Sequence, residues 1–217
     1  VVRTKLDKPG FVSVNVFLVD DKGKVVKQTY KDWAKKDRKR SIAYFAGTAV
    51  EPETLTDCGE PADFDAFWDR QRKRLAAVPF KDKVDLKKVK TVDGADIYAV
   101  SIPCAGPRPV TGYLNVPVNA KEKSLPAQIS FFGYGNHIQR PPSRGNSRLL
   151  TLTINAHGQE LGKDDAYYKQ FFESIKSNGK NYAFDPKQNA DPETAFFNGM
   201  ALRVMRALEY LKSRPEW

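Results

Sequence analysis

Hydrophobic and polar residues alternate near the start of the chain, with the period of two that is typical of a strand. Across residues 11–19 the apolar side chains fall mainly on one face of an extended chain. Residues 20–23 offer a turn, residues 24–30 are predicted to form the returning strand, and residues 41–50 form another apolar strand candidate. The pattern therefore predicts a β-rich segment over residues 1–57, which is short for a complete sandwich of about seven strands.

Residues 58–217 show a different pattern, in which helical periods alternate with apolar runs of strand length. Apolar residues recur at helical spacing from Phe64 to Val78 and predict a helix whose aromatic stripe packs into a core. Two continuous apolar runs, 127–132 and 149–154, predict parallel strands that are covered on both faces. The other predicted elements are strands over 84–92, 97–102 and 110–116, a helix over 164–177, and a long helix from residue 191.

The long helix closes the pattern. Its predicted apolar stripe comprises Phe196, Phe197, Met200, Val204, Ala207, Leu208 and Leu211. The succession of strands and helices predicts an α/β fold with a doubly wound sheet over residues 58–217. Because a helix in such a fold leads to another central strand, we expect this domain to be incomplete at residue 217.

Composition adds a strong positive charge and argues against a membrane span. No apolar run approaches the length of about 18 residues that a transmembrane helix requires. The net charge is +10, and residues 1–50 hold 12 Lys and Arg against 5 Asp and Glu. The basic run 35–40 is compatible with a polyanion contact or with a solvated strand or hairpin end. The second interpretation is favoured because aromatic residues do not interleave the run, so nucleic acid is not a predicted partner.

Two cysteines, Cys58 and Cys104, permit one disulfide. Each lies beside a stretch rich in Gly and Pro. A disulfide is expected if the protein is exported, and two free thiols are expected in the cytosol. The sequence leaves both alternatives open.

The candidate chemistry begins with Gly133-Tyr134-Gly135, at the end of a predicted strand. Flanking glycines let the backbone turn sharply and aim the Tyr134 N–H into a cleft, where it could stabilise an oxyanion. A plain turn between strand and loop is the alternative. The sequence contains no Gly-x-Ser-x-Gly turn that would supply a serine nucleophile.

A second loop, Asn155-Ala156-His157-Gly158-Gln159, follows the next predicted strand. Hydrogen bonds from the Gln159 side chain would brace the neighbouring loops. His137 and His157, the only histidines, have the chemistry of general bases. A structural role is favoured for both, because no Ser or Cys lies in a nucleophile motif.

The sequence contains no motif that indicates a metal site or a cofactor site. The histidines and cysteines lack any ligand spacing, and neither nucleotide-binding fingerprint occurs. We therefore predict no metal and no cofactor. The adjacent acids Asp164 and Asp165 are interpreted as a helix start rather than as a catalytic carboxylate pair.

Several segments, in order, resemble the acetyl xylan esterase and cephalosporin-C deacetylase family, which is carbohydrate esterase family seven and has the α/β-hydrolase fold. The resemblance covers about residues 58–217. The matching segments are Ala62-Asp63-Phe64-Asp65-Ala66-Phe67-Trp68, Pro109-Val110-Thr111-Gly112-Tyr113-Leu114, Phe132-Gly133-Tyr134-Gly135, Ala156-His157-Gly158-Gln159 and Arg206-Ala207. Two positions depart from the family: His157 stands where the family has Arg, and Phe132 stands where His is common.

The resemblance implies a metal-independent hydrolase of acetyl esters on xylan or xylo-oligosaccharides, with Ser as nucleophile, His as base and Asp orienting the His. Tyr134 would donate its backbone N–H to the oxyanion, and Gly133 and Gly135 would lie at the substrate. The triad residues would follow residue 217, so this chain alone is expected to be inactive and to require the C-terminal half of the hydrolase domain.

The resemblance also bears on the rest of the protein. The segment 1–57 resembles the Ig-like extension of some exported bacterial members, which implies export to the periplasm or medium and permits a homo-oligomer. The competing hypothesis is a non-catalytic module that binds carbohydrate or a protein partner.

Overall fold

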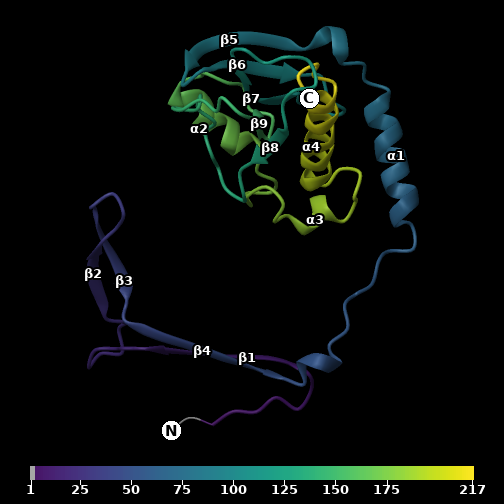
Figure 1. The fold of residues 1–217 in the computed structure, drawn as a ribbon. Coiled ribbons are helices and arrows are strands. Elements are labelled where there is room, and N and C mark those ends of the chain that lie inside the picture. Colours follow the sequence, from purple (N-terminus) through teal and green to yellow (C-terminus); the bar gives the residue numbers. More distant parts are fainter. Residues whose placement is uncertain (1–2) are drawn as a thin grey trace. The chain divides into compact units, whose positions relative to one another are not determined.

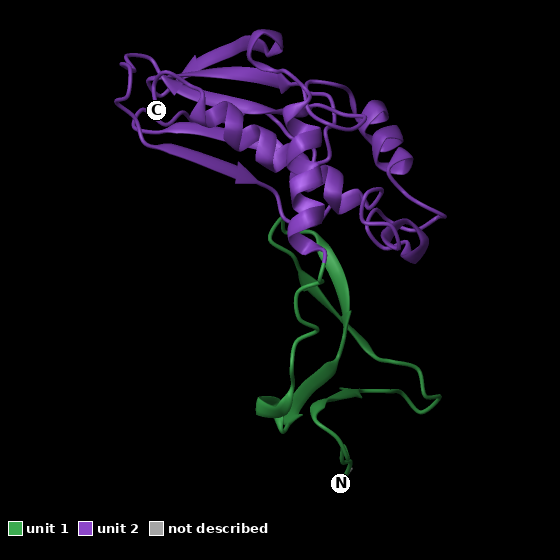
Figure 2. Cartoon of the chain, turned by 90° about the vertical axis from the view of Figure 1, so that its right-hand side faces the viewer, with its two compact units in different colours: residues 1–62 green, residues 63–217 purple. Residues whose placement is uncertain are grey.

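A computed structural model describes residues 3–217 of the chain, which divide into two compact units, one ending at Ala62 and the other spanning Asp63–Trp217 (Figure 2). Among the described residues no helix is both long and apolar enough to cross a membrane. Each unit is described by itself.

The first unit contains two antiparallel strand pairs (Figure 1). Strand β1 (Gly10–Phe17) pairs with β4 (Ala43–Val50), and β2 (Lys27–Lys31) pairs with β3 (Asp37–Ser41). A 3-10 turn, η1 (Pro52–Thr54), follows β4. The Ig-like assignment of this segment stays a prediction.

The pairing within the first unit differs from the sequence prediction. The predicted strand 24–30 was expected to return along β1, but only the bridge between Val19 and Val25 joins those two segments. The reason is a second turn, in which Asp32 Oδ1 accepts hydrogen bonds from the N–H groups of Ala34 and Lys36, each at 2.9 Å. This turn closes the β2–β3 hairpin, and it contains the start of the basic run, which is exposed as the favoured interpretation predicted.

The second unit is built on a five-stranded mixed sheet with the strand order β5-β6-β7-β9-β8. Strands β5 (Asp85–Val92), β6 (Ala95–Ile102) and β7 (Val110–Pro117) form an antiparallel meander, and β7 is also antiparallel to β9 (Leu150–Asn155). Strand β8 (Ala127–Phe131) runs parallel to β9, which confirms the predicted parallel pair. All five predicted strands are present.

Four helices and a short 3-10 turn complete the second unit. They are α1 (Phe64–Ala76), η2 (Lys81–Lys83), α2 (Asp165–Ser174), α3 (Pro186–Asn189) and α4 (Phe196–Lys212). Helix α4 packs against β6, β7, β8 and β9 (Figure 1). Its Leu202, Ala207 and Leu211 join the main core with Leu114 and Leu152 of the sheet.

The prediction that both parallel strands are buried on both faces was correct for β9 only. Leu150, Leu152 and Ile154 of β9 are fully buried, whereas Phe131 of β8 is 53% exposed. The difference follows from topology, because β8 is an edge strand of this sheet and β9 is internal.

Helix α1 departs from the predicted aromatic core. Phe64 is 40% exposed and Phe67 and Trp68 are half-buried, while the buried positions are Gln71 and Leu75. The aromatic rings pack chiefly on one another, with the centroids of Phe67 and Trp68 5.2 Å apart. The prediction that this stripe lies in the core was therefore wrong for its N-terminal half.

The buried face of α4 was also only partly predicted. Phe197 and Leu208 of the predicted stripe are 53% and 47% exposed, while Arg203 and Arg206 are buried. The Arg206 guanidinium donates hydrogen bonds to the carbonyl oxygens of Leu75 and Val78. Arg206 thus caps the C-terminal end of α1 with a positive charge. Polar hydrogen bonding between helices thus displaces the apolar stripe that spacing alone predicts.

Candidate active site

The Gly133–Gly135 loop leaves the end of β8 with its central N–H free. Among residues 3–217 no hydrogen-bond acceptor lies on the N–H of Tyr134. The Tyr134 side chain is 54% exposed, and its ring packs on Tyr182 and Phe184 at centroid distances of 4.8 and 5.5 Å. The side chain therefore anchors the loop, and the backbone donor stays available.

Gly135 is the glycine of this loop that the backbone requires. Its φ is 143°, and an added Cβ would lie 2.7 Å from Nε2 of His137. Gly133 has no positive φ and no atom within 4 Å of an added Cβ, so neither conformation nor space demands glycine there. The two candidate glycines thus differ in their reason for being present.

Two side chains hold Gly135 in place. The Gly135 N–H donates to the Tyr182 hydroxyl at 2.8 Å, and the Gly135 carbonyl lies 3.1 Å from Nε2 of His157. The Tyr182 hydroxyl also lies 3.3 Å from that carbonyl. Both backbone groups of Gly135 are therefore engaged, which holds the residue that follows Tyr134 in place.

His157 acts here as a buried neutral donor. The ring is only 5% exposed, and burial is the main cause that lowers the pKa of His157 below its usual value. Since a carbonyl oxygen only accepts, the hydrogen bond to Gly135 assigns the proton to Nε2. Nδ1 is buried without a partner among the described residues. The geometry therefore assigns His157 a positioning role on the loop.

Gln159 holds the next part of the same loop. Its side chain is fully buried, and Nε2 donates to the carbonyl of His137 at 3.0 Å. Asn155 Nδ2 donates to the same carbonyl at 3.3 Å, and Thr111 Oγ1 donates to the Gln159 carbonyl at 2.6 Å. The loop after β9 thus supports the loop after β8 through several hydrogen bonds.

Gly158 lets these two loops approach the start of β7. Its φ is 74°, and an added Cβ would lie 2.7 Å from Cβ of Arg108 and 2.9 Å from the Pro109 carbonyl oxygen. Because of both the positive φ and these short contacts, any residue larger than glycine would be strained at this position. Gly158 therefore sets the positions of its neighbours, His157 and Gln159.

The side chains of the remaining candidate residues take no part in this network. His137 is exposed and stacks on Phe132 at a centroid distance of 5.1 Å. Asp164 caps α2 by accepting a hydrogen bond from the Tyr167 N–H at 2.8 Å, which confirms the helix-start interpretation. Within residues 3–217 no cluster of three or more His, Cys, Asp or Glu side chains could hold a metal ion.

Both cysteines are free thiols in the structure. Cys58 is exposed in the first unit and Cys104 is buried in the second, where burial raises the pKa of its thiol. The pairing of Cys58 with Cys104 stays a prediction.

Sequence reasoning missed the part that three residues play in the site. Asn155 and Thr111 lie in segments that the motifs already marked, so their polar side chains at strand ends were a usable signal. Tyr182 had none, because it lies 47 residues from Gly135 in a stretch without a recognisable period. Only the tertiary structure brings its hydroxyl to the loop.

Chemically, the arrangement presents one backbone donor on a braced loop. A preorganised N–H of this kind stabilises negative charge that develops on an ester oxygen, because no reorganisation is needed as the reaction proceeds. The described residues supply that donor without a nucleophile motif beside it. A donor of this kind is one element that an acyl-transfer site requires.

Comparison with known proteins finds acetyl esterases that are similar to this chain. The chain is 23% identical over 167 residues to the acetyl esterase Axe7A of Xylanibacter ruminicola, a match that covers 72% of this chain and 36% of that protein. It also shares its fold with solved structures of an acetyl xylan esterase from Paenibacillus sp. R4 and of acetyl xylan esterase 1 from Thermoanaerobacterium sp. JW/SL YS485. The TM-scores are 0.59 and 0.54, and the identities are 21% and 19%.

The alignments cover 76% and 72% of this chain but only 51% and 47% of those two structures. The chain thus spans about a third of its curated relative and about half of the solved ones. The model of the acetyl xylan esterase (AXE1) family matches residues 55–216. The chain belongs to the acetyl xylan esterase family.

Proposed function

We propose that this chain is the N-terminal portion of a serine-type carbohydrate esterase that removes acetyl groups from xylan or xylo-oligosaccharides. The observation that carries the proposal is the free N–H of Tyr134 on a loop held by His157, Gln159 and Tyr182. Membership of the acetyl xylan esterase family supports the reaction class.

In the proposed mechanism a serine attacks the acetyl carbonyl and the carbonyl oxygen becomes negative. The Tyr134 N–H and the N–H of the residue after the serine donate to that oxygen. A histidine takes the serine proton and passes it to the sugar oxygen as the bond from that oxygen to the acetyl carbon breaks, and water then releases acetate from the acyl-enzyme. Gly133 and Gly135 flank the donor and leave room for the substrate. No metal or cofactor takes part.

We assign the serine, histidine and aspartate of this mechanism to polypeptide outside these residues, because the sequence has no Gly-x-Ser-x-Gly turn. The open edge of β8 is an argument for a further segment that covers this strand. A hollow of about 310 Å³ beside it is lined by Ala127, Ile129, Leu208, Leu211, Lys212 and Trp217. We propose that the C-terminal half of the hydrolase domain covers this largely apolar surface.

The finer assignments complete the proposal. In this proposal the first unit is an Ig-like extension and the protein is exported, and the family resemblance permits a homo-oligomer. The amphipathic strands of the first unit, all of whose described residues are at least partly exposed, support an extension that is covered by further protein.

Acetate release from acetylated xylan tests this function. The complete gene product is expected to release acetate, to be inactivated by a serine-directed sulfonyl fluoride and to be insensitive to a metal chelator. Residues 1–217 alone are expected to release none. Turnover by residues 1–217 alone, or loss of activity with the chelator, would contradict the proposal.

A further inference from the structure

A hollow in the second unit carries an uncompensated positive charge. It has a volume of about 260 Å³ and lies between the loop 105–108, the segment 193–195, helix α1 and the first turns of α4. Its charged lining residues are Arg74, Arg108, Glu193 and Arg203. No residue of the Gly133–Gly135 loop lines it, but it borders the loop after β9, because the ring of its lining residue Phe196 lies 5.8 Å from that of His157.

Arg203 is the central feature of this hollow. The side chain is only 3% exposed, and its Nε donates to the Ala156 carbonyl at 2.6 Å. Within the described chain no acceptor lies on either Nη group of Arg203. A Cβ added to Gly199, another lining residue, would lie 3.5 and 3.6 Å from the two Nη atoms. The absent side chain of Gly199 thus leaves the guanidinium fork facing the hollow.

Neighbouring groups add to the positive potential around Arg203, at a cost to its charged form. Burial first, and then the charge of Arg108, lower the pKa of Arg203 from its usual value to about 10. The N-terminus of α4 borders the hollow, and its N-cap residue Ala195 offers no side-chain acceptor to the first turn, in which the Asn198 N–H donates to the Ala195 carbonyl. A 17-residue helix without an acid in its first turn presents a partial positive charge there.

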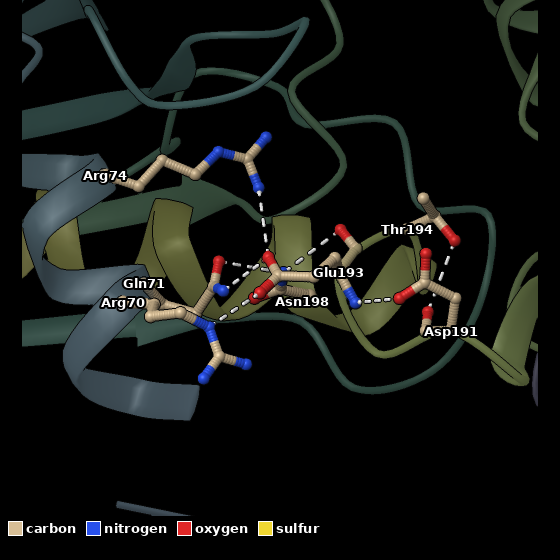
Figure 3. A network of polar contacts seen from close by, with 7 residues as sticks. All are labelled: Arg70, Gln71, Arg74, Asp191, Glu193, Thr194 and Asn198. Atoms are coloured by element: carbon tan, nitrogen blue, oxygen red, sulfur yellow. Dashed lines mark hydrogen bonds and ion pairs between the residues drawn. The ribbon is translucent and has the colours of Figure 1, made fainter. Parts of the chain in front are cut away.

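The acid in the wall does not neutralise Arg203. Glu193 is held by α1, accepting from Gln71 Nε2 at 2.5 Å and pairing with Arg70 Nε at 3.4 Å and Arg74 Nη1 at 4.0 Å (Figure 3). No ion pair joins it to Arg203 among the described residues. A buried cation without a partner is costly, so the hollow favours an incoming anion.

We propose that this hollow binds a small carboxylate anion. The planar fork of Arg203 matches the two oxygens of a carboxylate, and the partial positive charge of the α4 N-terminus favours the same anion. A hollow of this volume suits an anion of a few heavy atoms rather than an oligosaccharide. The inference does not rest on the proposed esterase function, because binding requires no turnover.

Acetate titration of the 217-residue chain at constant ionic strength tests the site, with the NMR signal of the Arg203 Nε–H as the readout. We expect a saturable shift with acetate and none with chloride. Arg203→Met should weaken acetate binding, followed by calorimetry, by about tenfold or more. Arg148→Met is the matched control, because Arg148 is exposed and lies outside the hollow.

Gly199→Ala provides a second variant that keeps Arg203 and favours the helix. Its methyl group fills space beside the fork, so acetate binding should weaken while the fold is retained. Equal binding by the parent and by both variants, or an equal response to chloride, would overturn the proposal.

The same titration on the complete gene product separates a free anion from an acidic side chain of another segment. Saturable acetate binding there supports the proposal. An Arg203 signal that is already shifted and insensitive to acetate overturns it.

Discussion

The two units of this chain share alternating strands but differ in what covers them. In the first unit no described residue is buried, and Phe11 of β1 is 75% exposed. In the second unit β6 and β7 are largely buried, and β9 contributes three fully buried apolar residues. Alternation therefore identifies a strand, but it does not say whether the apolar face meets a core.

The contrast also explains where the candidate site lies. A buried sheet fixes the ends of its strands, so loops that leave those ends can be held to within a hydrogen bond. The loops after β8 and β9 are joined in this way by His157 and Gln159. The β2–β3 hairpin, by contrast, is held by its own turn and strand pairing, without buried residues.

Truncation of one apolar residue in each unit should give the largest difference. Leu152→Ala removes a fully buried side chain and should lower the free energy of unfolding by about 2–5 kcal/mol. Val14→Ala, at a position that is 37% exposed, should change it by about 0.5 kcal/mol. Urea denaturation, with hydrogen exchange of the β9 and β1 amides, measures both. Equal losses would show that the first unit has a core of its own.

Two glycines with similar backbone angles give the next contrast. Gly158 and Gly23 have φ values of 74° and 75°, but only Gly158 has atoms within 4 Å of an added Cβ. Gly158→Ala should cost about 3 kcal/mol through strain and clash, and Gly23→Ala about 1 kcal/mol through the backbone alone. Thermal unfolding of the two variants compares them, and similar costs would remove the steric argument at Gly158.

A pH titration of stability tests the state of His157. Because burial lowers the pKa of His157, the unfolded chain binds a proton more readily than the folded one. Stability from this group is present above the unfolded pKa of about 6.5 and is lost as the pH falls towards the folded value, by at most about 1.4 kcal/mol per pH unit.

The variant His157→Gln should flatten this slope, measured by urea denaturation between neutral and mildly acidic pH. His137→Gln is the control, because the His137 ring is exposed. An unchanged slope in His157→Gln would show that the acid sensitivity arises elsewhere.

The smallest effect is expected at the surface of the first unit. Lys31 and Asp37 form an ion pair of 2.9 Å across the β2–β3 hairpin, with both side chains more than half exposed. Lys31→Gln should change the free energy of unfolding by about 0.5 kcal/mol or less, and high salt should remove the difference. A larger, salt-resistant loss would mean that this pair holds the hairpin together.

Much of the second unit was predictable, because period and turn chemistry act locally. The Asp93-Gly94 turn marks the β5–β6 hairpin, and two continuous apolar runs mark β8 and β9. The buried face of α4 was not predictable, because Arg206 is held there by carbonyl groups of α1 more than 120 residues away in sequence. Apolar spacing contains no information on such partners.

The site shows the same division. Tyr134 and Gln159 follow from motifs at strand ends, whereas the hydrogen bond from His157 to Gly135 needs the register of β8 against β9. The β2–β3 pairing failed as a prediction for a related reason. A turn organised by the single side chain of Asp32 decides it, and the alternation of residues on either side is compatible with both pairings.

The central claim, that the Tyr134 N–H is an oxyanion donor, is tested most directly by removing that N–H alone. Tyr134→Pro lacks the donor, and Tyr134→Ala keeps it while removing the same ring. In the complete gene product, acetate release should fall by about 10²–10³-fold in kcat for Tyr134→Pro relative to Tyr134→Ala. Equal kcat values for the two variants would contradict the account.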